Sequence, residues 1–266
     1  MLKKSSYVLA IARFSDPPAI EDLAGLALDD EELSEVRECR SGSCGLKLSA
    51  VEMAQLKRVT GEAGGDWKPA VQQAFRSLIL KRVTAYLADG HGALRPYENH
   101  VGQTWPATSF ALVLGHSVFL IEHLPRFAEH LSRYPQTPTP DVESFLYWSK
   151  ERVAGKANIS ATHVSILRNS HAGLPDTLVA GKELFATHYV NASLGLTALM
   201  RGESGRHSYL VYVNRSEVDL LGGVFGGLVR WFVQRRVKAE AANVLQGLRR
   251  RLESGLPPPI ETKRSS

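Results

Sequence analysis

The sequence predicts an α+β fold in which an antiparallel sheet of at least four strands grips a long C-terminal amphipathic helix, with a helical N-terminal half. Three observations predict it. Apolar residues recur at helical spacing in the first half of the chain, and strand-like runs joined by short turns begin near residue 142. A long apolar stripe at helical spacing then covers residues 221–253.

The N-terminal region, residues 1–141, is expected to be helical and to pack on the sheet. Asp29 followed by Glu32 forms a capping box, which predicts a short helix from Asp30 to Glu38. A longer helix is expected to end at Gly90, with an apolar stripe of Val71, Phe75, Leu78, Ile79, Val83, Tyr86 and Leu87. Residues 108–134 are expected to form a helix, a break at Pro125 and a second helix.

The C-terminal region, residues 142–254, is expected to hold the strands and the final helix. Aromatic and β-branched residues dominate four runs, "FLYWSKERV", "ANISATHVSILRN", "LVAGKELFATHYVNASLGLTALM" and "RHSYLVYVNR". The links between them are too short for crossover helices, so four consecutive antiparallel strands are expected. The third run is expected to bend or to form a bulge near residues 191–195, and the glycines of "GLPDTLVAGKE" are expected in loops.

The expected final helix, from Leu221 to Glu253, begins with the unusual sequence "GGVFGG". Each helical glycine costs about 1 kcal/mol relative to alanine, so close approach of a strand or of a bound molecule is the expected compensation. Residues 255–266 should be a disordered tail, and the rest is expected to form one structural domain.

The net charge of +5 is unevenly distributed along the chain. From Arg230 to the C-terminus there are nine Lys or Arg and three Glu, whereas residues 21–40 hold eight acidic and two basic residues. A solvated helix face with a basic tail explains this pattern, and peripheral contact of the basic C-terminal helix with an anionic membrane is the alternative. Nucleic acid is not an expected partner.

Targeting signals are weak in this sequence. The longest apolar stretch, "FALVLGHSVFLI", has about 12 residues, short of the ~18 of a membrane span. The apolar run from Tyr7 to Ala12 is too short for a signal peptide. As written, the chain is expected to be cytoplasmic. It would be periplasmic or secreted if the given N-terminus is truncated.

The two cysteines, Cys39 and Cys44, lie in "ECRSGSCGLKL". They could form a local disulfide in an oxidising compartment or remain two reduced thiols. A zinc site is disfavoured because no second cysteine pair or nearby histidine is present. The sequence contains no P-loop, dinucleotide fingerprint or Gly-x-Ser-x-Gly elbow, so no cofactor or metal is expected.

Polar residues on the expected strands are the candidates for chemistry. His163 and His188 lie in apolar surroundings, where a buried histidine that only satisfies hydrogen bonds is the simplest interpretation. If neighbouring strands bring them together with Tyr189 or Glu151, proton transfer is conceivable. Trp148 is expected in the core or in the wall of a pocket.

The order of strands followed by a long helix resembles the helix-grip arrangement of the START-like (SRPBCC, polyketide cyclase and lipid-transport) superfamily over about residues 142–253. A more specific resemblance, over nearly the whole chain, is to a group of bacterial proteins without an established activity. It rests on "RFSDPPAIEDLAGLALD", "CRSGSCGLKLSA", "YWSKERV", "ATHYVNASL" and "YLVYVNRSEVDLLGGVFGGLVR". This resemblance implies additional N-terminal sequence with an export signal and a first strand.

Three functional hypotheses follow. The first is binding or transport of a hydrophobic small molecule or lipid between the sheet and the C-terminal helix, in a cavity lined by Trp148, His163, His188, Tyr189, Tyr212 and Phe225. The second is an enzyme on the same scaffold, with His163 or His188 as acid or base. The third is a structural or interaction protein without a cavity. Catalysis is the less favoured hypothesis, because the sequence contains no motif that is typical of a particular reaction.

Overall fold

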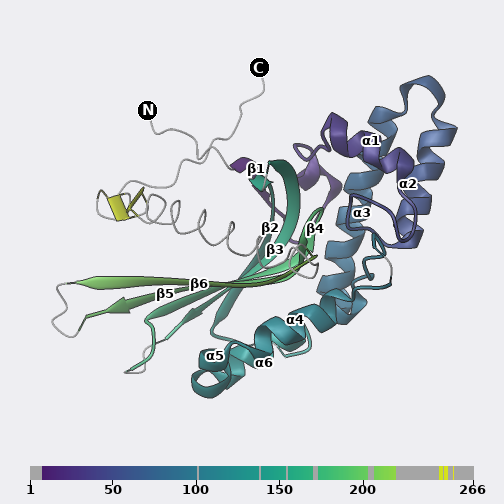
Figure 1. The fold of residues 1–266 in the computed structure, drawn as a ribbon. Coiled ribbons are helices and arrows are strands. Elements are labelled where there is room, and N and C mark those ends of the chain that lie inside the picture. The colour runs from purple at the N-terminus through teal and green to yellow at the C-terminus, as the bar shows by residue number, and fades with distance from the viewer. Residues whose placement is uncertain are drawn as a thin grey trace. The chain divides into compact units, whose positions relative to one another are not determined.

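A six-stranded antiparallel sheet organises the chain in the computed structural model (Figure 1). The structure describes residues 8–100, 102–137, 139–153, 155–169, 173–202, 207–219, 246–247, 249–250 and 254. The strands lie side by side in chain order: β1 (Val8–Arg13), β2 (Val142–Val153), β3 (Lys156–Arg168), β4 (Thr177–Ala186), β5 (Val190–Arg201) and β6 (Ser208–Val218). The chain up to Val218 belongs to one compact unit.

The prediction of a sheet that grips a long C-terminal helix is wrong. The described residues between 142 and 218 form strands and their connecting turns, and the described α-helices that pack on the sheet come from earlier in the chain. Side chains such as Trp148 and Ile159 on one face of the sheet join the same buried cluster as Phe75 and Ile79 of a preceding helix. These apolar strand residues therefore have a cover already. Most of the segment 221–253, including its paired glycines and Phe225, and the tail 255–266 lie outside the described residues.

Local sequence signals explain where the first helices begin and end. Helix α1 (Asp30–Glu38) starts at the capping box of Asp29 and Glu32, as predicted, and α2 (Ala50–Glu62) starts at a second box formed by Ser49 and Glu52. Helix α3 (Lys68–Asp89) ends at Gly90, whose φ is 78°. A Cβ at Gly90 would lie 2.6 Å from the carbonyl oxygen of Tyr134, so glycine is required there for packing as well as conformation.

The remaining helices differ slightly from prediction. The segment 106–133 contains α4 (Pro106–Gly115), α5 (Val118–His123) and α6 (Pro125–Arg133), so the chain breaks at residues 116–117 as well as before Pro125. Helices α4 and α6 share a second buried cluster with β4 and β5, which includes Phe110, Phe127 and Leu194. All six α-helices that precede β2 thus belong to the same unit as the sheet, on one side of it (Figure 1).

Two strands were not expected. The run "LVAGKELFATHYVNASLGLTALM" forms a hairpin of two strands rather than one bent strand, because residues 187–189 make a tight turn between β4 and β5. Tyr189 in this turn has a φ of 62°, a conformation that is uncommon for a residue with a Cβ. The short apolar run near the N-terminus forms β1, which pairs with β2. Within the described part of the chain, no helix is both long enough and apolar enough to cross a membrane.

Candidate functional site

The face of the sheet that points away from the helices contains a hollow of about 360 Å³, here named the sheet hollow. Side chains alternate between the two faces of a strand. Trp148 is buried on the helix side, so Tyr147 and Ser149, which flank it in β2, point into the sheet hollow. Strands β2 to β6 all contribute to its lining, which consists of Tyr147, Ser149, Glu151, Ser160, Thr162, Val164, Val179, Gly181, Glu183, Ser193, Gly195, Thr197, Tyr212 and Asn214. Most of these residues carry a hydrogen-bonding side chain, and none of these fourteen described residues is Lys or Arg.

Two glycines form the floor of the sheet hollow. Gly181 of β4 is the direct partner of Gly195 of β5. A Cβ added at Gly181 would lie 3.6 Å from Thr162, and one added at Gly195 would lie 3.6 Å from Tyr212 and Asn214, so both positions have room for a side chain. Glycine weakens a strand interior and often marks a place where a ligand or another backbone approaches. The pair therefore leaves strand backbone open at the centre of the hollow.

Hydrogen bonds orient the polar side chains around this floor. The hydroxyl of Ser193 lies 2.9 Å from that of Ser216 and accepts from Asn214 Nδ2 at 3.3 Å. Toward the other edge, the hydroxyl of Ser149 lies 3.2 Å from that of Ser160 and 3.1 Å from Glu151 Oε1. Such mutual contacts restrict the rotamers of these groups, so they are positioned before any ligand arrives.

Two carboxyl groups line the sheet hollow, and they influence each other. Burial raises the pKa of Glu183 to about 8, the negative charge of Glu151 adds to the increase, and Lys47 opposes it. At pH 7 the Glu183 carboxyl therefore holds its proton and can donate a hydrogen bond. Burial also raises the pKa of Tyr147, so its hydroxyl remains a donor. The hollow combines neutral donors with the carboxylate acceptor of Glu151.

A second polar group, here named the buried basic cluster, lies under the helices: Tyr86, His91, His130, His163 and Lys182. Tyr86 Oη lies 2.7 Å from His163 Nδ1. Lys182 Nζ donates to the carbonyl of Leu131 at 2.7 Å and lies 4.3 Å from the ring centre of Phe110. Lys182 is completely buried and His163 is 1% exposed, so both are closed to solvent.

Burial keeps this cluster largely uncharged. It lowers the pKa of His163 to about 3, with further lowering by Lys182 and His130, and it lowers the pKa of Lys182 to about 7. A neutral His163 can accept a hydrogen bond from the Tyr86 hydroxyl at Nδ1, while its Nε2 finds no hydrogen-bond partner among the described residues. Proton exchange with a substrate would require the helices to open, which favours a structural role for His163.

His188 lies at a third location, the turn between β4 and β5. Its Nδ1 donates to the carbonyl of Gly45 at 2.9 Å, and its Nε2 lies 3.4 Å from Glu32 Oε1. Its backbone N–H donates to Asn158 Oδ1 at 2.9 Å. The Gly45 hydrogen bond connects the turn to the loop that follows α1, and Nε2 faces Glu32 of α1 without a hydrogen bond among the described residues.

The residues expected to line one cavity are distributed over three sites. Trp148 faces the helices, where its Nε1 donates to the carbonyl of Asp22 at 2.8 Å, and His163 faces them too. His188 and Tyr189 lie in the β4–β5 turn, and Tyr212 lines the sheet hollow. Phe225 lies outside the described residues. The two histidines and Tyr212 therefore do not meet.

No family model, curated protein or solved structure matches this chain.

The function must therefore be inferred from the geometry of this chain. The START-like resemblance stays an expectation, since no comparison bears on it. Among the described residues no group of three or more His, Cys, Asp or Glu could hold a metal ion. The sheet hollow is the site where convergent polar groups and a perturbed carboxyl pKa occur together.

Sequence reasoning missed the central residues of this site. Gly181 was expected in a loop but lies within β4, and Gly195 lies within β5. A signal was available, because glycine in the middle of a strand-like run often marks a close approach of another group. The strand pairing that brings Glu151 and Glu183 to one face depends on register and on a bulge between Ala161 and Thr162. No single run of residues reveals that pairing.

Proposed function

We propose that this protein binds a small organic molecule that carries hydroxyl or carbonyl groups, and that it does so in the sheet hollow. The observation that carries the proposal is the Gly181–Gly195 pair beneath a ring of oriented hydrogen-bonding side chains. Packing does not require glycine at either position, because a side chain would fit at both, and glycine weakens a strand interior. A ligand in contact with the strand backbone explains the omission.

The size and chemistry of the hollow fit such a ligand. Its volume of about 360 Å³ lies at the small end of the ~300–1,000 Å³ typical of ligand pockets. The protonated Glu183 carboxyl and the Tyr147 hydroxyl can donate to a ligand oxygen, and Glu151 can accept from a ligand hydroxyl. Val164 and Val179 offer apolar contact for the carbon skeleton.

A hydrophobic ligand, as expected from the sequence, is less favoured by this lining. A purely apolar molecule would remove these polar groups from water without giving them partners, at a cost of ~1–3 kcal/mol for each group. An amphipathic ligand that directs oxygen atoms to the floor avoids that cost. The proposal therefore keeps the binding function and changes the chemical class of the ligand.

The enzyme hypothesis has weaker support, because His163 and His188 lie away from the sheet hollow and are engaged elsewhere. Contact with an anionic membrane through the segment 221–253 remains a proposal about residues that mostly lie outside the described ones. Neither alternative is needed to explain the hollow.

Mass spectrometry of compounds extracted from purified native protein tests the proposal. We expect a stoichiometric oxygen-containing small molecule from the wild-type protein, and its loss from Gly195→Val, which fills the hollow. Leu199→Val is the matched control, because it lies on β5 outside the hollow and is 39% exposed. Equal retention by Gly195→Val would contradict the proposal. So would an empty wild-type protein that no polyol, monosaccharide or hydroxy acid stabilises against heat.

A further inference from the structure

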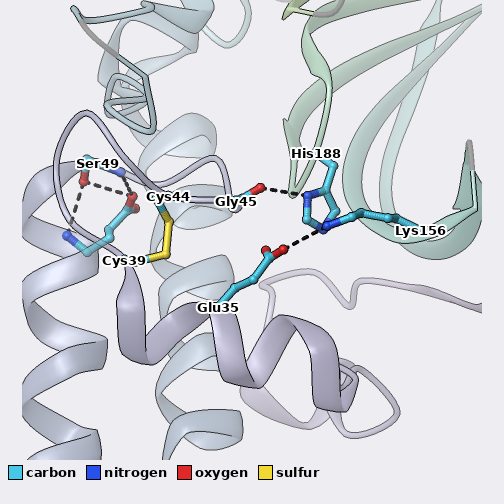
Figure 2. The surroundings of a disulfide bond; sticks show 8 residues. Glu35, Cys39, Cys44, Gly45, Ser49, Lys156 and His188 are labelled. Carbon is cyan, nitrogen blue, oxygen red and sulfur yellow. Dashed lines mark hydrogen bonds and ion pairs between the residues drawn. A yellow bond between two sulfur atoms is a disulfide. The ribbon is translucent and has the colours of Figure 1, made fainter.

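The Cys39–Cys44 disulfide lies at the edge of a hollow that is separate from the sheet hollow. The two sulfurs are bonded, and the bridge closes a short loop at the C-terminal end of α1 (Figure 2). Gly42 turns this loop with a φ of 80°, and reciprocal backbone hydrogen bonds of 3.1 and 2.9 Å join Arg40 and Ser43. Both cysteines line a hollow of about 670 Å³.

The same loop holds the turn between β4 and β5. Immediately after Cys44, the carbonyl of Gly45 accepts from His188 Nδ1 at 2.9 Å, a contact drawn in Figure 2. Two residues later, the backbone N–H of Lys47 donates to the carbonyl of Thr187 at 2.9 Å. A Cβ at Gly45 would lie 2.2 Å from Glu35 Oε2, so the loop is packed tightly against α1. The disulfide thus fixes a segment that clamps the sheet through His188.

The charges around this hollow favour an anionic partner. Its charged or titratable lining consists of Glu35, Arg37, Glu38, Lys57, Arg40 and His100. Glu35 is neutralised by Lys156 at 2.8 Å. Arg37 lies 5.4 Å from the ring centre of Trp67. Arg37, Arg40 and Lys57 therefore outnumber Glu38 among the remaining charged residues of the lining.

We propose that the Cys39–Cys44 disulfide is an exchange site for an anionic low-molecular-weight thiol, and that its reduction releases the clamp on the β4–β5 turn. The proposal is independent of ligand binding in the sheet hollow. Cys39 is buried and Cys44 is only partly buried, so Cys44 Sγ is the sulfur that an incoming thiolate reaches.

The exchange has two balanced steps. The thiolate attacks Cys44 Sγ, a mixed disulfide forms, the Cys39–Cys44 bond breaks, and Cys39 leaves as a thiolate that takes up a proton. A second thiol attacks the mixed disulfide and releases Cys44. Two thiols are oxidised to one disulfide, and the two cysteines gain two electrons and two protons. Cys39 caps the C-terminal end of α1, where negative charge is disfavoured, and the neighbouring Arg40 offsets this effect.

The fold favours a local response to reduction. The bridge joins residues only five positions apart, so it constrains the unfolded chain less than a long-range disulfide does. Loss of the bridge is therefore expected to loosen residues 40–47 and 187–189 while α3 remains intact.

The first test measures reduction of the folded full-length protein by reduced glutathione, with alkylation of the freed thiols and mass spectrometry. We expect reduction to be faster than global unfolding. The Arg40→Gln/Lys57→Gln variant should react at least about threefold more slowly with glutathione and at an unchanged rate with neutral 2-mercaptoethanol. Reduction only at the rate of unfolding would overturn the proposal, as would an equal change with both thiols.

Hydrogen exchange tests the clamp. In the reduced wild-type protein, the amides of Lys47 and His188, which donate to Thr187 and Asn158, should exchange faster than in the oxidised protein, and α3 amides should not change. The Cys39→Ser/Cys44→Ser variant should match the reduced protein. If that variant does not fold, the reduced wild type alone decides. Unchanged exchange at Lys47 and His188 would overturn the clamp.

Discussion

Gly181 on β4 and Gly195 on β5 are direct partners on adjacent strands, and each position has room for the Cβ that it lacks. The pair connects the strand register to the proposed function, because the register alone places these glycines together.

Replacement of either glycine should separate stability from binding. Gly181→Val and Gly195→Val are expected to leave the free energy of unfolding unchanged or to raise it by about 0.5–1 kcal/mol, because glycine weakens a strand interior. The bound compound should be lost from both variants. Thermal melts and extraction mass spectrometry measure the two effects. Parallel loss of stability would show instead that the glycines are needed for packing.

The buried ion pair between α2 and α3 should contribute strongly to stability. Arg82 Nε and Nη2 donate to Glu52 at 2.8 and 2.6 Å, and both side chains are almost fully buried. Glu52→Gln would leave a buried guanidinium without its counter-charge, which costs about 3–5 kcal/mol. Urea unfolding measures this cost.

The surface pair Arg58–Glu62 is the control for that prediction. Its atoms lie 3.8 Å apart and both side chains are largely exposed. Glu62→Gln should change the free energy of unfolding by less than about 1 kcal/mol. Similar effects of the two substitutions would contradict the account of the core.

The hydrogen bond between Tyr86 and His163 should matter for folding rather than for catalysis. Tyr86→Phe removes a buried partner at 2.7 Å, so the free energy of unfolding should fall by about 1–3 kcal/mol. Ligand retention in the sheet hollow should not change, because this contact lies on the opposite face. A variant that keeps full stability but loses the ligand would contradict the separation of the two faces.

Stability should decrease in the acid range because of His163. Its pKa is about 3 in the folded protein and near 6.5 when unfolded, so the unfolded chain binds the extra proton as the pH falls. The contribution of neutral His163 is complete above pH ~6.5 and is lost progressively toward pH ~3. Unfolding measured at pH 7 and pH 4.5 should show a smaller difference in His163→Gln than in the wild type.

Glu183 should produce the opposite pH dependence. Its pKa rises from 4.5 to about 8 on folding, so the folded protein binds the extra proton. This contribution is fully present below pH ~4.5 and is lost as the pH rises through ~8. Lys182 acts in the opposite direction from pH ~7 upward, so the comparison of wild type with Glu183→Gln isolates the effect. An unchanged profile between pH 5 and 8.5 would contradict a protonated Glu183.

The sequence predicted the local elements better than their arrangement. The boundaries of α1 and the end of α3 at Gly90 follow from helix caps, and each cap involves only a few neighbouring residues. The helix-grip arrangement was wrong because an apolar strand face does not specify which helices cover it. Trp148 and His163 find their partners in Asp22 and Tyr86, far away in the chain.

The candidate site was only partly predictable for the same reason. Tyr212 was expected in a ligand site and lines the sheet hollow, but Glu183 and the facing glycines were overlooked. Their significance depends on the β4–β5 hairpin, and the three-residue turn at 187–189 has none of the usual Asn-Gly or Asp-Gly turn signals. Strand register therefore carries the information that local patterns lack.

The most direct test of the central claim is a ¹⁵N–¹H correlation spectrum of the stripped protein, recorded before and after addition of the extracted compound. We expect shifts concentrated at the amides of Gly181, Gly195 and Asn214, with no change at the indole N–H of Trp148 on the opposite face. Shifts centred on Trp148 and the helices, with the two glycines unaffected, would contradict ligand binding in the sheet hollow.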